Sequence, residues 1–152
     1  MKFWLFKTEP DVFSIDDLER EKVSFWEGVR NYQARNYLRD EVKLGDLILF
    51  YHSSTQPTGI VGIAEVVGEG EPDPHQFNAK SPYYDEKADP NKPRWFGVRI
   101  KLKHRFKEIL TLETLRNEAK LKDMLLLKRG MRLSIQPVSD REFQRINELG
   151  LR

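Results

Sequence analysis

The chain has 152 residues, of which 39% are hydrophobic and 33% charged, a balance that fits a globular domain and excludes a disordered or fibrous chain. Its formal net charge of +2 is far from that of a histone-like protein, and the absence of cysteine excludes disulfides, thiolate catalysis and cysteine-ligated zinc. A chain of this length is expected to form a single domain over residues 1–152. There is no apolar run as long as the roughly 18 residues of a membrane span and no signal-peptide pattern. We therefore expect the protein to be cytoplasmic, or nuclear if the source is a eukaryote.

The N-terminal quarter predicts one strand and two helices. Residues 2–6 (KFWLF) are typical of a short strand, which ends at the turn-forming sequence TEP. Ser14, with Asp17 three residues later, forms a capping-box pattern ahead of a short helix. A second helix is expected over residues 32–42.

The middle of the chain predicts the centre of a sheet. Residues 43–53 and 58–69 are two apolar runs separated by a Pro-Thr-Gly turn, which is typical of a β-hairpin. Residues 70–93 contain five prolines and predict a long surface loop whose aromatics hold part of it to the protein. A third long strand is expected over residues 94–106.

The C-terminal part predicts helices at the edge of this sheet. Residues 111–130 indicate two short helices, the second ended by Gly130, and residues 132–138 return as a strand. Ser139 and Glu142 form a second capping box ahead of the last helix. Long strands joined by hairpins do not alternate with helices as βαβ units, so we expect an α+β fold, a compact, partly closed barrel with peripheral short helices.

The usual signatures of enzymes are absent. The chain has no GxGxxG, GxxxxGK[ST], GxSxG or HExxH motif. His52, His75 and His104 lie in three different segments without helical spacing, so neither a metal nor a cofactor is expected. We therefore expect no catalytic residue.

Polar and aromatic residues gather where the apolar segments end. Residues 26–36 (WEGVRNYQARN), residues 50–54, Ser134 and Gln136 have this character. If they converge, they make a flat slot with an aromatic wall and amide or hydroxyl groups, which suits a nucleobase lifted out of its stack. The alternative from composition alone is structural, with Trp26 at the edge of the core and the amide residues capping a helix or satisfying backbone groups.

The charge distribution leaves the same choice open. Between Lys101 and Arg132 there are ten Lys or Arg against four Asp or Glu, whereas residues 65–73 carry four acids and no base. These cations would contact phosphates if they share one face, or they are simply the solvated faces of helices and strands.

Seven separated motifs resemble one known family. FKTEPDVFSIDDL, WEGVRNYQARNYLR, LGDLILFYHSS, GIVGIAEVV, SPYYD, PRW and RLSIQPV occur in this order over nearly the whole chain, and together they closely resemble the EVE-domain family. The resemblance implies a PUA-like fold, a mixed-strand pseudo-barrel with peripheral short helices. It also implies a non-catalytic module that binds nucleic acid, DNA or RNA, and recognises a flipped modified base such as a modified cytosine.

The resemblance also implies a set of site residues. The base pocket would be formed by Trp26, Val29, Asn31, Tyr32, Gln33, Ala34, Asn36, Tyr51, His52, Ser53, Ser134 and Gln136. Lys7, Glu9, Arg30 and Arg35 would stand at its mouth or contact phosphates. Two other hypotheses remain: an enzyme acting on a nucleoside-like molecule with His52 beside Ser53, and a binding module for a small nucleoside-like ligand or a protein partner.

Overall fold

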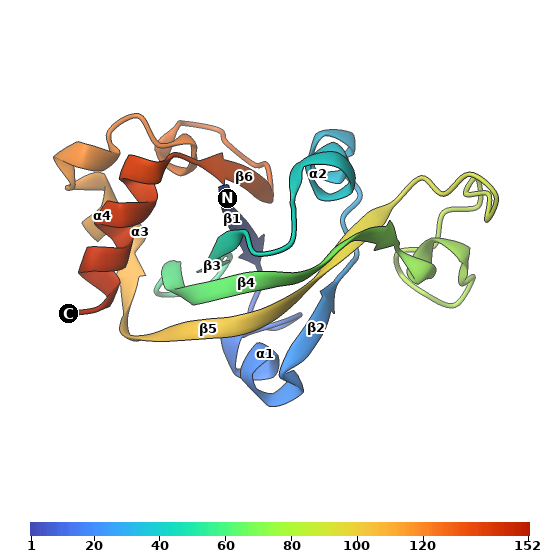
Figure 1. Cartoon of the computed structure of the whole chain (residues 1–152), viewed down its shortest axis with the longest axis horizontal. Helices are drawn as coiled ribbons and strands as arrows, with labels where there is room; N and C mark the ends of the chain where they lie inside the picture. Colours follow the sequence, from blue (N-terminus) through green and yellow to red (C-terminus); the bar gives the residue numbers. More distant parts are fainter.

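A six-stranded mixed sheet forms the centre of the protein in the computed structural model, which describes residues 1–152. Its strands are β1 (Phe3–Thr8), β2 (Val23–Trp26), β3 (Leu47–His52), β4 (Gly59–Pro72), β5 (Phe96–Thr111) and β6 (Ile135–Val138). They lie in the order β2-β5-β4-β3-β1-β6, with β1 and β3 parallel and all other neighbours antiparallel. The long strands β4 and β5 curve through the middle of the molecule (Figure 1).

The α+β class is confirmed, and the sheet curves without closing into a complete barrel. The edge strands β2 and β6 have only four residues each and are not paired with one another. Side chains close part of the gap, because the ring of Trp26 on β2 lies 5.1 Å from that of Phe6 on β1. The curved sheet therefore brings its two edges near one another without joining them by backbone hydrogen bonds.

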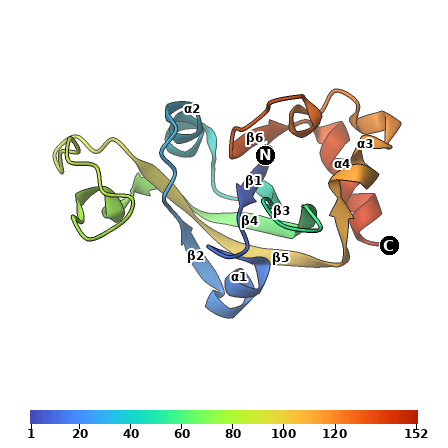
Figure 2. The same cartoon turned by 180° about the vertical axis from the view of Figure 1, so that it is seen from behind.

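Helices cover both faces of the sheet. Figures 1 and 2 show α1 beside β2 at one side and α3 and α4 together at the opposite end of β5. No helix has the length and apolar character needed to cross a membrane. The helical segments are α1 (Ile15–Glu21), α2 (Tyr32–Asn36) with its π-helical continuation η1 (Tyr37–Glu41), the 3₁₀ turns η2 (Pro74–Phe77), η3 (Ala119–Leu121) and η4 (Leu125–Leu127), α3 (Leu112–Arg116) and α4 (Asp140–Gly150).

Two apolar clusters pack against the two faces. The first joins Trp4, Phe6 and Phe50 of the sheet to Ile15 of α1 and Leu38 of η1. The second cluster packs on the other face of the same strands. Its members from the C-terminal helical segments are Leu115, Leu121, Leu126, Phe143 and Ile146. Because side chains alternate along a strand, β1 supplies residues to both clusters.

Local signals located most elements correctly. Both capping boxes are present, with the Ser14 hydroxyl accepting from the Asp17 N–H and the Ser139 hydroxyl from the Glu142 N–H. The prediction of two helices over residues 111–130 was wrong in its second half, where two 3₁₀ turns replace a helix. Strand β2 was not predicted, because its four residues carry too short a pattern to distinguish them from a turn.

Candidate functional site

A cavity of about 480 Å³ lies where the open edges of the sheet approach one another. Volumes of this size are typical of small-molecule sites. The end of β2, the end of β1, the residue before β6 and the loop between β4 and β5 all contribute to it. Its walls are Lys7, Thr8, Glu9, Val12, Phe13, Glu21, Phe25, Trp26, Glu27, Gly28, Val29, Arg30, Tyr83 and Ser134.

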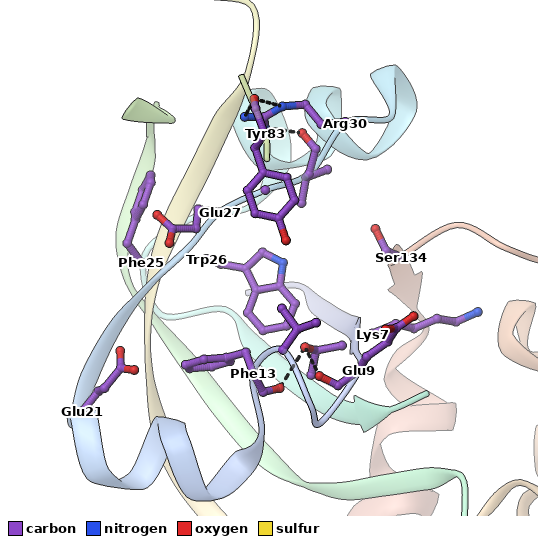
Figure 3. A pocket seen from close by; sticks show the side chains of 14 residues that line it. Lys7, Glu9, Phe13, Glu21, Phe25, Trp26, Glu27, Arg30, Tyr83 and Ser134 are labelled. Atoms are coloured by element: carbon purple, nitrogen blue, oxygen red, sulfur yellow. Dashed lines mark hydrogen bonds between the residues drawn. The ribbon is translucent and has the colours of Figure 1, made fainter. Parts of the chain in front are cut away.

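Trp26 forms the centre of the cavity wall (Figure 3). Its ring is held edge-on by Phe13 at 6.1 Å and Phe50 at 5.7 Å, and the residue is only 7% exposed. The indole nitrogen nevertheless has no hydrogen-bond partner in the protein. Gln136 Oε1 is the only buried side-chain polar atom without a hydrogen-bond partner, so the unpaired indole nitrogen of Trp26 is not itself buried. The indole N–H therefore reaches solvent in the cavity, on the edge that faces the Tyr83 hydroxyl.

Tyr83 supplies a second aromatic ring, and Gly28 makes room for it. Gly28 has φ +79°, and a Cβ at this position would lie 2.8 Å from the Tyr83 ring. The ring therefore packs directly on the backbone that follows β2, which only glycine permits. Two aromatic side chains from distant segments thus face one cavity.

A buried ion pair fixes the loop that carries Tyr83. The side chain of Asp73 is fully buried, and it accepts hydrogen bonds from the Gly28 N–H at 2.8 Å, the Arg30 Nη1 at 3.0 Å and the His75 N–H at 2.8 Å. Arg30 also donates to the carbonyl of Tyr83 through Nε at 3.1 Å and Nη2 at 2.7 Å. These bonds tie the segment after β2 to the loop between β4 and β5.

His75 packs against the ring of Tyr83. His75 Nδ1 lies 2.8 Å from the Ser81 hydroxyl, and its Nε2 lies 3.1 Å from Glu27 Oε1. The imidazole meets the ring of Tyr83 edge-on at 5.8 Å. The Ser81 hydroxyl also accepts from the Tyr83 N–H at 3.1 Å, so the aromatic wall has a hydrogen-bonded support.

The end of β1 forms the opposite wall. The N–H of Lys7 donates to the carbonyl of Ser134 at 2.8 Å, which joins this wall to the segment before β6. Lys7 Nζ donates to the carbonyl of Met131 at 3.1 Å and lies 5.9 Å from the centre of the Tyr51 ring. Burial lowers the pKa of the Lys7 ammonium.

The structure brings part of the expected set together. The expected residues that line the cavity lie on or just after β1, on β2, in the segment after β2 and just before β6. They are Lys7, Glu9, Trp26, Val29, Arg30 and Ser134. The guanidinium of Arg30 donates to Asp73 and to the carbonyls of Tyr83 and Val29, so its four hydrogen bonds all go to the protein itself.

The expected residues of α2 lie outside the cavity. Asn31 caps the helix through its Oδ1, which accepts from the Ala34 N–H at 2.9 Å, and Ala34 is buried in the core. Tyr32 stacks on Trp95 at 4.9 Å. The remaining members are Gln33 and Asn36, which are exposed, and Arg35, whose Nη1 donates to the carbonyl of Arg94.

The expected residues of β3 and β6 also lie apart from it. His52 Nε2 accepts from the Ile15 N–H at 3.1 Å, and burial lowers the pKa of its imidazole. Tyr51 packs in the second apolar cluster, and Ser53 donates its N–H to the carbonyl of Thr8. Gln136 is buried, with Nε2 donating to the carbonyl of Leu133 and Oε1 without a partner.

Sequence reasoning missed three of the four aromatic residues that line the cavity. Tyr83 belongs to the long loop, where nothing in its spacing relates it to Trp26, although it lies within the SPYYD motif. The other members missed were Thr8, Val12, Phe13, Glu21, Phe25, Glu27 and Gly28. Contact across the gap between the sheet edges is a tertiary property, so only SPYYD pointed to Tyr83.

Comparison with known proteins identifies the class. The model of the EVE domain matches residues 2–149, and the chain belongs to the EVE-domain family. Among its relatives is thymocyte nuclear protein 1 of Gallus gallus, 40% identical over 159 aligned positions that cover 92% of this chain and 65% of the relative. The chain spans between 65 and 73% of the length of the curated relatives it matches.

Two solved structures resemble this fold closely. A protein of Pseudomonas syringae is 42% identical with a TM-score of 0.92, and the match covers 97% of this chain and 98% of that one. Human THYN1 protein, solved in complex with DNA containing 5-methylcytosine, is 36% identical with a TM-score of 0.91. That match covers 100% of this chain and 99% of the human one.

Proposed function

We propose that this chain is a non-catalytic module that binds nucleic acid and holds a flipped modified cytosine in the cavity beside Trp26. The observation that carries this proposal is the pair of aromatic rings, Trp26 and Tyr83, that face one cavity together with an unpaired indole N–H. The complex of human THYN1 with DNA containing 5-methylcytosine supports DNA as the partner and 5-methylcytosine as the base.

The chemistry of the cavity suits a base that has left its stack. Stacking on an aromatic side chain contributes roughly 1–3 kcal/mol per base, which offsets much of the cost of flipping. The indole N–H of Trp26 is a donor for a base carbonyl, and the hydroxyl of Ser134 is a donor or acceptor at the opposite wall. A base therefore finds ring faces and polar partners in the same space.

Cations next to the cavity are suited to the phosphates on either side of a flipped base. The segment before β6 borders the cavity, since Ser134 at its end lines the wall. Lys128, Arg129 and Arg132 in this segment are exposed and form no ion pair. We assign them, rather than Arg30 with its buried partner Asp73, to the phosphate contacts.

The direct test is a titration with short oligonucleotides that differ at one base. DNA and RNA strands with 5-methylcytosine or cytosine at one central position would be compared by fluorescence anisotropy at fixed salt. We expect the methylated DNA to bind more tightly than its unmethylated counterpart. Equal affinity for both bases would contradict base recognition, whereas preference for the RNA pair would change the assigned partner.

Tyr83 and its neighbour provide a matched pair of variants. Tyr83→Ala removes a wall of the cavity, and we expect about tenfold to a hundredfold weaker binding of the methylated strand, the loss of one stacked base. Tyr84→Ala removes the same side chain one position later, where it is 45% exposed and does not line the cavity. Both variants leave the core intact, and equal effects on binding would contradict the role of Tyr83.

The two alternative functions give different results in the same experiments. Catalysis by His52 would need a free imidazole, but its Nε2 accepts from the Ile15 N–H. Mass spectrometry of bound oligonucleotides after prolonged incubation checks this point, since a reader leaves the base unchanged. Competition by free nucleosides without any oligonucleotide binding would instead indicate a small-ligand module.

The relatives also suggest where the protein works. The word nuclear in the names of the animal relatives supports a nuclear location in a eukaryotic cell. In a cell without a nucleus the same module would work in the cytoplasm. Imaging of a fluorescent fusion in the source cell measures this directly.

A further inference from the structure

The cavity is lined by more carboxylates than cations, although a site that only contacted the negatively charged phosphates of DNA would favour cations. Three of its lining residues, Glu9, Glu21 and Glu27, are carboxylates, against the two cations Lys7 and Arg30. Figure 3 shows Glu21 and Glu27 on one side of Trp26, and Glu9 with Lys7 on the other. Carboxylates therefore stand on both sides of the indole ring, with Glu27 3.1 Å from His75 Nε2 and Glu21 accepting from the Ser24 hydroxyl.

Neither cation neutralises these carboxylates. The guanidinium of Arg30 forms its ion pair with Asp73, a buried acid outside the cavity lining, at 3.0 Å. The ammonium of Lys7 donates to the Met131 carbonyl, and its side chain extends away from Trp26 (Figure 3). The Glu9 side chain has no hydrogen bond or ion pair, so its charge is available to a ligand.

The aromatic residues favour the same kind of ligand as the carboxylates. The face of a Trp or Tyr ring attracts a cation by about 0.5–2 kcal/mol, and more strongly where water is excluded. The Trp26 residue is 7% exposed, and its unpaired indole N–H, which faces the cavity, adds a donor there. A suitable ligand is therefore flat, carries one carbonyl acceptor, and presents N–H donors or positive charge to the carboxylates.

We propose that the cavity selects among modified cytosines by their charge, with a cationic N-alkylated cytosine bound most tightly and an anionic 5-carboxyl derivative rejected. This inference rests on the proposed function, in that a flipped base enters the cavity. 3-Methylcytosine, which is positively charged at neutral pH, has the required pattern. Its O2 accepts from the indole N–H, its exocyclic amino group donates to a carboxylate such as Glu9, and its charged ring lies against Tyr83.

The test compares four single-stranded DNA oligonucleotides of one sequence, with cytosine, 5-methylcytosine, 3-methylcytosine or 5-carboxylcytosine at the central position. Single strands are used because 3-methylation blocks base pairing. At fixed salt and neutral pH we expect 3-methylcytosine to bind at least about fivefold more tightly than 5-methylcytosine, the size of one cation–π contact. We expect 5-carboxylcytosine to bind at least about fivefold more weakly, because its carboxylate meets those of the cavity.

A pair of charge-neutralising variants separates the local effect from the overall field. Glu9→Gln keeps the shape of the side chain and removes a cavity charge, so the ratio of affinities for 3-methylcytosine and 5-methylcytosine should fall at least twofold. Glu108→Gln makes the same charge change on β5, where the residue is exposed and does not line the cavity. We expect this control to strengthen binding of every strand slightly and to leave the ratio unchanged.

The possible outcomes distinguish the two proposals. Tighter binding of 5-methylcytosine than cytosine, together with equal affinities for the charged derivatives, would overturn charge selection and leave the proposed function standing. An affinity order in which 5-carboxylcytosine exceeds 5-methylcytosine would overturn it as well. If 5-methylcytosine and cytosine bind equally while 3-methylcytosine binds more tightly, recognition of methylation at C5 fails and charge selection stands.

Discussion

Trp26 shows how one residue serves both the core and the cavity. Its ring packs against Phe6, Phe13 and Phe50, which are members or neighbours of the first apolar cluster. Its N–H edge, by contrast, is open to the cavity. Tryptophan suits this position because a large apolar body and one polar group occupy different edges of the same ring. The apolar contacts fix the ring, so the donor is already oriented before a ligand arrives.

His52 gives the fold a pH dependence that can be measured. Burial lowers the pKa of its imidazole below the ordinary value of about 6.5, and this outweighs the opposite effect of Asp16. Since the folded pKa lies below the unfolded one, the stabilisation is fully present above the unfolded pKa of about 6.5 and is lost as the pH falls from there through the lower folded pKa. Protonation also removes the acceptor for the Ile15 N–H.

We therefore expect the free energy of unfolding to decrease between about pH 7.5 and pH 5.5, by no more than about 1.4 kcal/mol per pH unit from this group. Urea titrations across this range measure it. His52→Gln retains an acceptor for the Ile15 N–H but does not titrate, so its unfolding free energy should vary less with pH. A variant with the same pH slope as the original protein would show that other groups control it.

At the scale of elements, the junction after β2 determines the shape of the site. Residues 26–30 leave β2, pass Gly28 with its positive φ and bring Arg30 to Asp73 on the other loop. Helix α2 then begins at Tyr32 with Asn31 as its cap. The start of this segment thus lines the cavity, and its end forms the capped helix that the structural interpretation predicted.

Gly28→Ala tests this junction, and Gly45→Ala is its control. Both glycines have positive φ, +79° and +88°, so an alanine adds a similar backbone cost of roughly 1 kcal/mol at each. Only at Gly28 does the new methyl group meet the Tyr83 ring; nothing lies within 4 Å at Gly45. We expect comparable losses in thermal stability but weaker binding of methylated DNA only for Gly28→Ala, as measured by anisotropy. A Gly28→Ala variant with full affinity would mean that the position of Tyr83 does not matter.

At the scale of the whole molecule, the open sheet and the charge pattern act together. The cavity lies between two unpaired edges, and Ser134, at the end of the segment that carries Lys128, Arg129 and Arg132, lines it. Three carboxylates and two cations line the cavity, and the cations Lys128, Arg129 and Arg132 do not. In the proposed function these three cations attract phosphates and the cavity selects the base.

Replacing rim cations should weaken binding without changing selectivity. For Arg129→Gln with Arg132→Gln, we expect similar decreases of affinity for methylated and unmethylated strands. The slope of log affinity against log salt should become shallower by about 0.7–0.9 for each phosphate that the protein no longer neutralises. Lys103→Gln with Lys107→Gln makes the same charge change on exposed positions of β5 away from the cavity lining. An equal change of slope in both variants would contradict a localised phosphate site.

Local sequence signals predicted most of the fold because they depend on neighbouring residues. The capping boxes at Ser14 and Ser139 and the hairpin of β3 and β4 follow from side chains a few positions apart. Strand β2 was missed because four residues carry little periodicity, and its pairing with β5 lies far away in the sequence. The α+β class was therefore predictable, whereas the open edge of the sheet was not.

The candidate site divides in the same way. The amino-acid sequence by itself determined the family, the capped elements and the presence of Trp26 in an aromatic and amide-rich segment. Only the tertiary structure placed Tyr83 on Gly28, committed Arg30 to Asp73 and turned the side chains of α2 away from the cavity. The physical reason is that composition and local spacing specify which groups a segment carries, while the direction in which they point depends on packing between segments that are distant in the chain.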